Sequence, residues 1–148
     1  FMAHFAELKR ETDPFDSSKT NLVVQRVVVV SNEHVESDEH FSGEQWCIKF
    51  FGPHTTWKQT SYNRIFRKKY AGRGDVYDPA KNKFLSPQLF ASWSLDANDD
   101  WQAPVTAPTD REGYTISWDE AGQKWTAVKH SDRTNWNWDS SGLAWVSG

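Results

Sequence analysis

A pattern of one aromatic residue, one aspartate, several turn residues and a second aromatic residue recurs in the second half of the chain. It covers residues 77–84, 118–125 and 138–145, and the two aromatic residues are separated by the same interval in each copy. A looser copy covers residues 93–101, where either one residue is inserted or Leu95 replaces the first aromatic residue. More than any other feature, this spacing constrains the fold, because it predicts a series of short β-hairpins.

The residues between the aromatic pair suit a tight turn. An aspartate at the first turn position can accept a hydrogen bond from the backbone two residues on, and Pro79 has the fixed φ of a type I turn. Gly122 and Gly142 stand where hairpin loops often need a positive φ. Cross-strand aromatic pairs stabilise a hairpin by roughly 0.2–1 kcal/mol each. We therefore expect three structural clasps: Tyr77 with Phe84, Trp118 with Trp125, and Trp138 with Trp145.

Aromatic residues supply most of the material for a hydrophobic core. Only 37% of the residues are hydrophobic and the mean hydropathy is -0.77, yet the chain has 9 Trp, 9 Phe and 4 Tyr. Each such side chain can bury roughly 150–250 Å². Tryptophan is also enriched at binding interfaces, so a core role and an interface role are both open.

The first half of the chain predicts strands and one helix. Residues 3–8 alternate apolar and polar, and residues 22–30 are rich in valine, so both segments are typical of strands. The turn-rich residues 12–18 between them indicate a hairpin with a long loop. Residues 31–40 are polar and acidic and predict another loop, and residues 55–60 predict a strand.

Residues 42–52 predict a short helix. Ser42 with Gln45 three residues on matches a capping box, and Gly52 followed by Pro53 is a stop signal. Trp46, Cys47 and Phe50 would then form one apolar face. The expected fold class is mainly β with one short helix.

Two domains follow from this organisation. Residues 1–75 are expected to form an N-terminal α+β docking domain, and residues 76–148 an aromatic β-hairpin repeat region. Proline-bearing stretches at residues 84–90 and 102–108 predict extended links between the hairpins, and hence an elongated array.

Charge and cysteine content favour some partners over others. The net charge of -3 argues against general nucleic-acid binding, and no apolar run approaches the roughly 20 residues of a membrane span. Cys47 is the single cysteine, which excludes an internal disulfide.

The basic residues 64–70 include Arg67, Lys68 and Tyr70, which could contact an acidic partner. A solvated charged strand or loop is the simpler interpretation.

No motif for catalysis, a cofactor or a metal ion emerges, and we expect a protein that is not an enzyme. The five histidines have no zinc-ligand spacing. Asp96, Asp99 and Asp100 lie close together but lack a calcium-loop signature, so a solvated acidic turn is expected there. The tripeptide at residues 73–75, Arg-Gly-Asp, is expected to be a turn or a chance match.

Several segments, in the same order along the chain, resemble small virion structural proteins of marine tailed bacteriophages, particularly those infecting cyanobacteria. The similar segments are residues 2–6, 24–32, 57–63, 66–72, 87–96, 101–105, 107–110 and 114–125. The chain departs from that family at residues 13–18, 73–75 and 136–148. The resemblance implies a component of the virion and leaves capsid, neck, baseplate and fibre open as its position.

Two functions follow as hypotheses. In the first, multiple symmetric copies bind a major capsid or tail protein, and Trp93 and Trp101 join Arg67, Lys68 and Tyr70 as contact residues. In the second, the chain is a carbohydrate-binding module on a fibre or baseplate, where exposed tryptophan rings stack on host glycans. Asp96 and Asp99 would then bind sugar hydroxyls.

Overall fold

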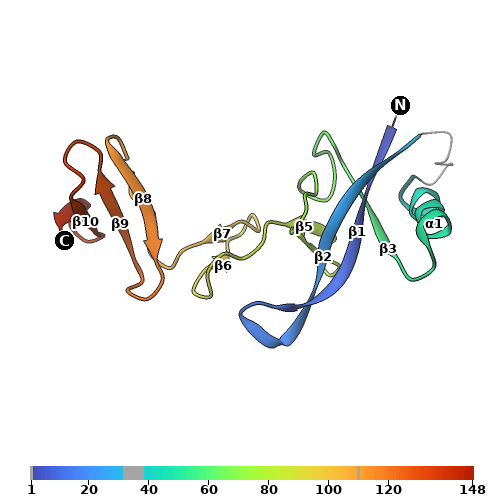
Figure 1. The fold of residues 1–148 in the computed structure, drawn as a ribbon, viewed down its shortest axis with the longest axis horizontal. Helices are drawn as coiled ribbons and strands as arrows, with labels where there is room; N and C mark the ends of the chain where they lie inside the picture. Colours follow the sequence, from blue (N-terminus) through green and yellow to red (C-terminus); the bar gives the residue numbers. More distant parts are fainter. Residues whose placement is uncertain (1, 32–38, 110) are drawn as a thin grey trace. The chain divides into compact units, whose positions relative to one another are not determined.

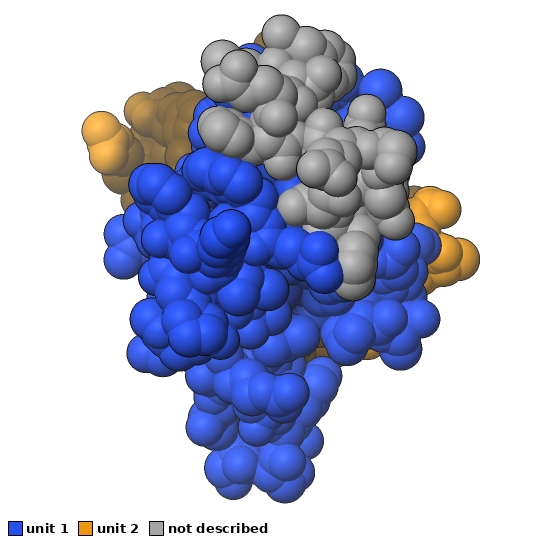
Figure 2. All heavy atoms as spheres, turned by 90° about the vertical axis from the view of Figure 1, so that its right-hand side faces the viewer, with its two compact units in different colours: residues 1–87 blue, residues 88–148 orange. Residues whose placement is uncertain are grey.

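The computed structural model describes residues 2–31, 39–109 and 111–148, which form two compact units, residues 1–87 and 88–148 (Figure 2). The described chain is mainly β with one short helix, as the sequence predicts. Unit 1 contains β1 (Met2–Asp13), β2 (Asp16–Ser31), α1 (Glu39–Phe51), β3 (Thr56–Thr60), β4 (Val76–Asp78) and β5 (Lys83–Leu85). Unit 2 contains β6 (Ser94–Leu95), β7 (Trp101–Gln102), β8 (Tyr114–Asp119), β9 (Lys124–Lys129), β10 (Asn135–Asp139) and β11 (Ala144–Ser147).

The first aromatic hairpin belongs to unit 1, and this moves the boundary between the units. β4 pairs with β2 through Leu22 opposite Tyr77 and Val23 opposite Val76, so β4 and β5 extend the N-terminal sheet. That sheet has the strand order β3-β1-β2-β4-β5. The chain therefore divides after residue 87 and not after residue 75. Residues 76–87 resemble the later repeats in composition, but long-range strand pairing joins them to the N-terminal sheet.

β1 and β2 form the hairpin that the sequence predicts, but the long loop expected at residues 12–18 is not there. The two strands stay paired as far as Asp13 and Asp16, and only Pro14 and Phe15 lie between them. Asp13 stabilises this tight turn, because its carboxylate accepts a hydrogen bond from the Phe15 N–H at 2.8 Å. The polar residues act as turn acceptors at the end of a long hairpin and do not form an open loop.

The far part of this hairpin is a two-stranded ribbon. β3 pairs with β1 only from His4 to Leu8, and β4 pairs with β2 only at Leu22 and Val23. Residues 9–13 therefore pair only with β2, and residues 16–21 only with β1, within the described chain. The ribbon continues past the rest of the sheet (Figure 1).

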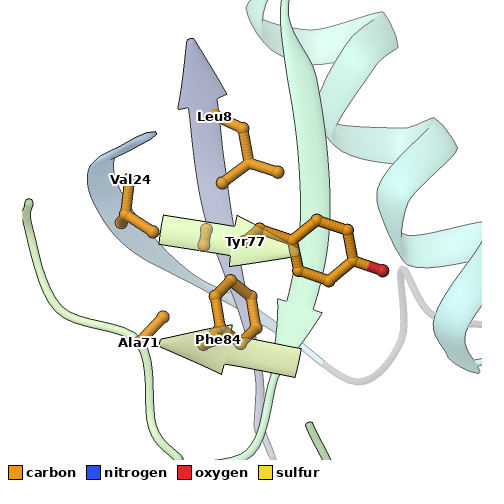
Figure 3. Packing of buried hydrophobic residues seen from close by; sticks show 6 residues of the cluster. Leu8, Val24, Ala71, Tyr77 and Phe84 are labelled. Atoms are coloured by element: carbon orange, nitrogen blue, oxygen red, sulfur yellow. The ribbon is translucent and has the colours of Figure 1, made fainter. Parts of the chain in front are cut away.

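Both faces of the N-terminal sheet are covered, because side chains alternate along β1. Ala6 and Leu8 lie in one cluster with Val24, Ala71, Tyr77 and Phe84 (Figure 3). Ala3 and Phe5 point to the other face and pack with Val30, Cys47 and Trp57. The core of unit 1 thus consists of two thin layers on either side of one sheet.

The helix differs from its prediction at its start and on its exposed side. It begins at Glu39, so Ser42 lies inside the helix and is not its N-cap. Phe50 is 68% exposed and stacks on Trp46 with ring centroids 5.0 Å apart, whereas Cys47 is fully buried. Gly52 ends the helix as expected, with a φ of 127° and its N–H bonded to the Ile48 carbonyl. Most of the loop predicted at residues 31–40 lies outside the described residues.

A glycine brings the helix close to the sheet. A Cβ atom on Gly43 would lie 2.1 Å from Cζ of Phe5, whose side chain is fully buried. The ring therefore packs directly against the helix backbone. No side chain larger than hydrogen fits there unless the helix moves away from β1.

The four-stranded sheet of unit 2 joins hairpins that the sequence treats as separate. Its strand order is β11-β10-β9-β8, and all neighbours are antiparallel. The second and third copies of the repeat are thus consecutive hairpins of one meander (Figure 1). The looser copy forms a separate two-stranded sheet of β6 and β7.

The close approach at Gly43 predicts that Gly43→Ala destabilises unit 1. In a helix, alanine is more favourable than glycine by about 1 kcal/mol. We expect the clash with Phe5 to cancel this gain and to leave a net loss of stability of about 1–3 kcal/mol, the usual cost of overpacking a core. Thiol labelling of Cys47 across a urea gradient measures this, because burial raises the pKa of this thiol to about 12 and protects it in the folded state. We expect Gly43→Ala to be labelled at lower urea.

Gly72→Ala is the matched control. A Cβ at Gly72 would meet only Oδ2 of Asp75, at an ordinary contact distance of 3.6 Å. Its labelling curve should coincide with that of the wild type. A Gly43→Ala protein as stable as the wild type would contradict the close packing of Phe5 on the helix.

Candidate functional site

The aromatic residues of each good repeat face each other across their hairpin. Register places Tyr77 opposite Phe84, Trp118 opposite Trp125, and Trp138 opposite Trp145. Their ring centroids are 5.3, 5.1 and 5.1 Å apart, and the two tryptophan pairs meet edge to face. Such geometry is the favoured one for aromatic pairs. The spacing of the repeat therefore corresponds to the clasps expected from it.

An aspartate side chain holds each turn. Asp139 accepts hydrogen bonds from the N–H groups of Ser141 and Gly142, both at 3.1 Å, and these bonds lower the pKa of its carboxyl group. Asp119 accepts from the Gly122 N–H at 3.2 Å, and Asp78 accepts from the N–H groups of Ala80 and Lys81. The carboxylates satisfy backbone donors that the hairpin leaves unpaired.

The glycines of the turns have a different role from the predicted one. Positive φ occurs one position later, at Asn82, Gln123 and Leu143, with values of 54°, 48° and 52°. A Cβ on Gly122 or Gly142 would instead lie 2.6 Å from Oδ2 of the turn aspartate. Glycine therefore makes room for the capping carboxylate, and the left-handed position is left to residues with side chains.

Strand pairing decides between the two alignments of the looser copy of the repeat. Leu95 lies opposite Trp101, so Leu95 replaces the first aromatic residue. Asp96 accepts hydrogen bonds from the Asn98 and Asp100 N–H groups through Oδ1 and from the Gln102 amide through Oδ2. Asp99 is 8% exposed and has a φ of 61°. The Asp96 carboxylate thus holds the turn between β6 and β7.

Aromatic side chains gather on one face of the unit 2 sheet. Paired residues point to the same side and alternate along a strand, so Ile116, Trp118, Ala127, Trp136 and Trp138 share a face. The opposite face carries polar groups such as Ser117 and Thr126, whose hydroxyls lie 3.3 Å apart. The sheet therefore has one aromatic and one largely polar face.

Trp93 packs against this aromatic face. Its ring lies 6.3 Å from Trp118 and 6.1 Å from Trp125, and Phe90 contacts it at 5.4 Å. The expectation that prolines leave Trp93 at an edge is wrong, because the chain folds back on the sheet. Glu120 fixes that arrangement by accepting hydrogen bonds from the Ser92 N–H and hydroxyl, at 3.0 and 2.5 Å. Trp101, the other predicted contact, is half-buried on β7.

The predicted basic contact residues contribute to the internal structure of unit 1. The Arg67 side chain is only 10% exposed, and its guanidinium donates to the Gln59 carbonyl at 2.9 Å. Glu44 accepts from the Gln59 N–H at 2.8 Å and lies 3.8 Å from Arg67. Together the two side chains occupy the free edge of β3 as a neighbouring strand would. Lys68 is half-buried with a φ of 71°.

Tyr70 belongs to a small aromatic group at the end of β3. Its ring lies 5.5 Å from His4 and 5.3 Å from Tyr62, and His4 and Tyr62 stack at 5.4 Å. Partial burial raises the pKa of Tyr70 and lowers the pKa of His4, since it disfavours the charged form of each. Tyr62 is 66% exposed and is the accessible member of the group.

The Arg-Gly-Asp tripeptide is a structural turn. Asp75 is buried, forms an ion pair with Lys69 at 3.0 Å, and accepts the Gly72 N–H at 2.8 Å. The Gly74 N–H and the Asp75 carbonyl both bond to the backbone of Val24. An aspartate held in this way is not displayed to a receptor.

One cleft in unit 2 was not foreseen from the sequence. Its volume is about 510 Å³, and it lies between the proline-bearing segment before β8 and the turn of the last hairpin. The lining residues are Pro104, Val105, Thr106, Ala107, Thr109, Trp138, Ser140 and Leu143. The proline and threonine content of residues 104–109 was the only available signal, because the cleft depends on how that segment folds onto the hairpin.

Comparison with protein-family models, with curated proteins and with solved structures found no match for this chain. In the part of the chain that the structure describes, no three His, Cys, Asp or Glu side chains gather so as to hold a metal ion. Nor does any described helix have the length and apolarity needed to cross a membrane.

The left-handed backbone of Leu143 predicts that Leu143→Gly stabilises unit 2. A residue with a Cβ atom in this conformation costs about 1–2 kcal/mol, and glycine avoids that cost. Part of the gain is offset, because glycine makes the unfolded chain more flexible and so raises the entropy lost on folding. We expect a net gain of about 0.5–1 kcal/mol. Urea unfolding followed by tryptophan fluorescence measures it, because seven of the nine tryptophans lie in unit 2.

Leu143→Ala separates backbone strain from side-chain exposure. It removes the same side chain, which is 74% exposed, but keeps a Cβ in the left-handed conformation. No gain is expected for this variant. Equal stabilisation by alanine and glycine would show that the strain at this turn is not the cause.

Proposed function

We propose that this protein is an accessory structural component of a tailed-phage virion, where it binds the capsid or tail surface as multiple symmetric copies. The segments that resemble small virion proteins extend over most of the chain, and this resemblance is the reason for proposing a phage particle as the location. The two-stranded ribbon of β1 and β2 is the observation that carries the proposal, because a two-stranded arm of this kind is suited to pairing with another protein.

The ribbon is held in shape although no third strand supports it among the described residues. An isolated two-stranded hairpin is marginally stable in water. Here Asp13 accepts hydrogen bonds from the Phe15 N–H and from the Asn21 amide at 2.9 Å, and both bonds lower the pKa of its carboxyl group. Asp16 accepts from the Ser18 N–H and hydroxyl in the same way. The turn thus keeps a defined shape at the end of the arm.

The end of the ribbon presents an aromatic side chain. Phe15 is one of the two turn residues and is 44% exposed. The outer backbone edges of the ribbon have hydrogen-bonding groups that a partner strand can pair with. An exposed aromatic ring on such an arm is suited to insertion between neighbouring subunits.

The charges on the ribbon favour a protein partner. Three basic residues, Lys9, Arg10 and Lys19, are balanced by three acidic ones, Glu11, Asp13 and Asp16. A balanced arm has no long-range attraction to nucleic acid. Its contacts with a partner would come from backbone pairing and from the ring of Phe15.

The test is rebinding of the purified protein to phage particles that lack it, followed by sedimentation and cryo-electron microscopy. The wild type should co-sediment to saturation and occupy symmetric positions, whose copy number distinguishes the capsid lattice from the tail axis. Phe15→Ser should weaken binding about tenfold, as expected for loss of one aromatic anchor worth about 1.4 kcal/mol.

Phe50→Ser is the matched control, because Phe50 is also an exposed phenylalanine but lies on α1. It should bind as the wild type does. Absence of the chain from native purified particles would overturn the virion assignment. Equal binding by Phe15→Ser and the wild type would remove the ribbon as its attachment element.

The cleft of unit 2 favours carbohydrate binding as a second candidate function. It includes a half-buried tryptophan and three hydroxyl side chains in a volume typical of small-ligand sites. On a fibre or baseplate this would serve adhesion to a host-surface glycan. The lining residues do not include Asp96 and Asp99, which were expected from the sequence to bind sugar hydroxyls.

A further inference from the structure

The cleft of unit 2 has free hydrogen-bonding groups and no charge. The side chains of Thr106, Thr109 and Ser140 line it, and their hydroxyls make no hydrogen bond within residues 39–109 and 111–148. None of the lining side chains is ionisable. A ligand that fits this site must therefore be neutral and must itself offer donors and acceptors.

Trp138 differs from Trp118, Trp125 and Trp136 on the same face, because the indole N–H groups of those three have acceptors. Trp118 donates to Glu120 at 2.8 Å, Trp125 to the Val105 carbonyl at 2.9 Å, and Trp136 to Thr134 at 2.6 Å. The indole N–H of Trp138 has no such acceptor in the described chain. The buried indole N–H of Trp93 also lacks one, but Trp93 does not line the cleft. Its half-buried ring lines the cleft, so both a flat apolar surface and a donor are available to a ligand.

The wall opposite Trp138 is fixed by internal contacts. The Trp125 indole holds the Val105 carbonyl, Pro108 is fully buried, and Arg111 donates to the Pro108 carbonyl at 2.8 Å. The cleft consequently exists before any ligand arrives. Binding there does not require ordering of the segment, which lowers its entropic cost.

We propose that this cleft binds a neutral saccharide, with one sugar ring stacked on Trp138 and its hydroxyls bonded to Thr106, Thr109 and Ser140. A sugar presents an apolar C–H face and a rim of hydroxyls, which match an indole ring bordered by free hydroxyl groups. The proposal rests on the second candidate function and names its site and ligand class. It concerns unit 2 and is independent of attachment through the ribbon.

Nuclear magnetic resonance of the full chain, labelled with ¹⁵N, tests the proposal. The nine tryptophans give nine indole N–H signals, and Trp138→Phe identifies the one that belongs to Trp138. The probes are maltotriose, mannotriose and chitotriose, with a triuronate as the acidic counterpart and a neutral triproline-containing peptide as the alternative ligand. Each is added to about 10 mM, tenfold above a millimolar dissociation constant.

We expect at least one neutral trisaccharide to shift the Trp138 signal in a saturable manner. Thr106→Val and Ser140→Ala remove hydroxyls with little change of shape, and each should weaken binding about fivefold. The matched control is the double variant Ser117→Ala with Thr126→Val, which loses hydroxyls from the opposite face of the sheet and should bind as the wild type does.

Failure of every neutral saccharide to shift the Trp138 signal would overturn the proposal, as would a preference for the triuronate or the peptide. Equal affinity of Thr106→Val, Ser140→Ala and the wild type would also overturn it. These outcomes concern the isolated protein. They are distinguishable from failure of the virion assignment, which is judged on phage particles.

Discussion

The hydrogen bonds from backbone N–H groups to a turn aspartate are the interaction on which the hairpins depend. In the last hairpin, one carboxylate oxygen of Asp139 holds two successive N–H groups, and the chain then passes through the left-handed residue Leu143. This fixes the number of residues in the turn. Because side chains alternate with a period of two, the turn length also decides that Trp138 and Trp145 point to the same face.

This local rule has long-range consequences in unit 2. The pairing of β9 with β10, with Trp136 opposite Ala127, then places the aromatic residues of the two consecutive hairpins on a common face. That face must be covered, and Trp93 together with the segment that includes Val105 covers part of it. Trp138 remains half-buried beside the segment, and the cleft is the space left next to it.

The sequence was most informative where structure is local. The hairpin register, the clasps and the ends marked by Asp and Gly follow from residues close together in the chain. Glycine at Gly122 and Gly142 was assigned to backbone strain, whereas the structure shows room for a carboxylate. That distinction needs the position of the Asp side chain, which spacing does not provide.

Features that depend on distant segments were predicted less well. Arg67 was expected to contact an acidic partner, but it meets Glu44 and the Gln59 backbone because α1 and β3 come together in the fold. The predicted domain boundary after residue 75 was wrong because β4 pairs with β2, which lies far upstream in the sequence. The cleft was missed for the same reason, since its two walls are separated by the whole of β8 and β9.

The central claim is that the aspartate turns set aromatic residues opposite each other on one sheet face. Nuclear Overhauser effects from the tryptophan ring protons to neighbouring side chains in the full chain test it most directly. The account predicts cross-peaks between the rings of Trp118 and Trp125, between Trp138 and Trp145, and between Trp145 and Tyr114, which stacks on it at 5.3 Å. Cross-peaks that instead join Trp118 to Lys124 or Thr126 would place the hairpin one residue out of register and contradict it.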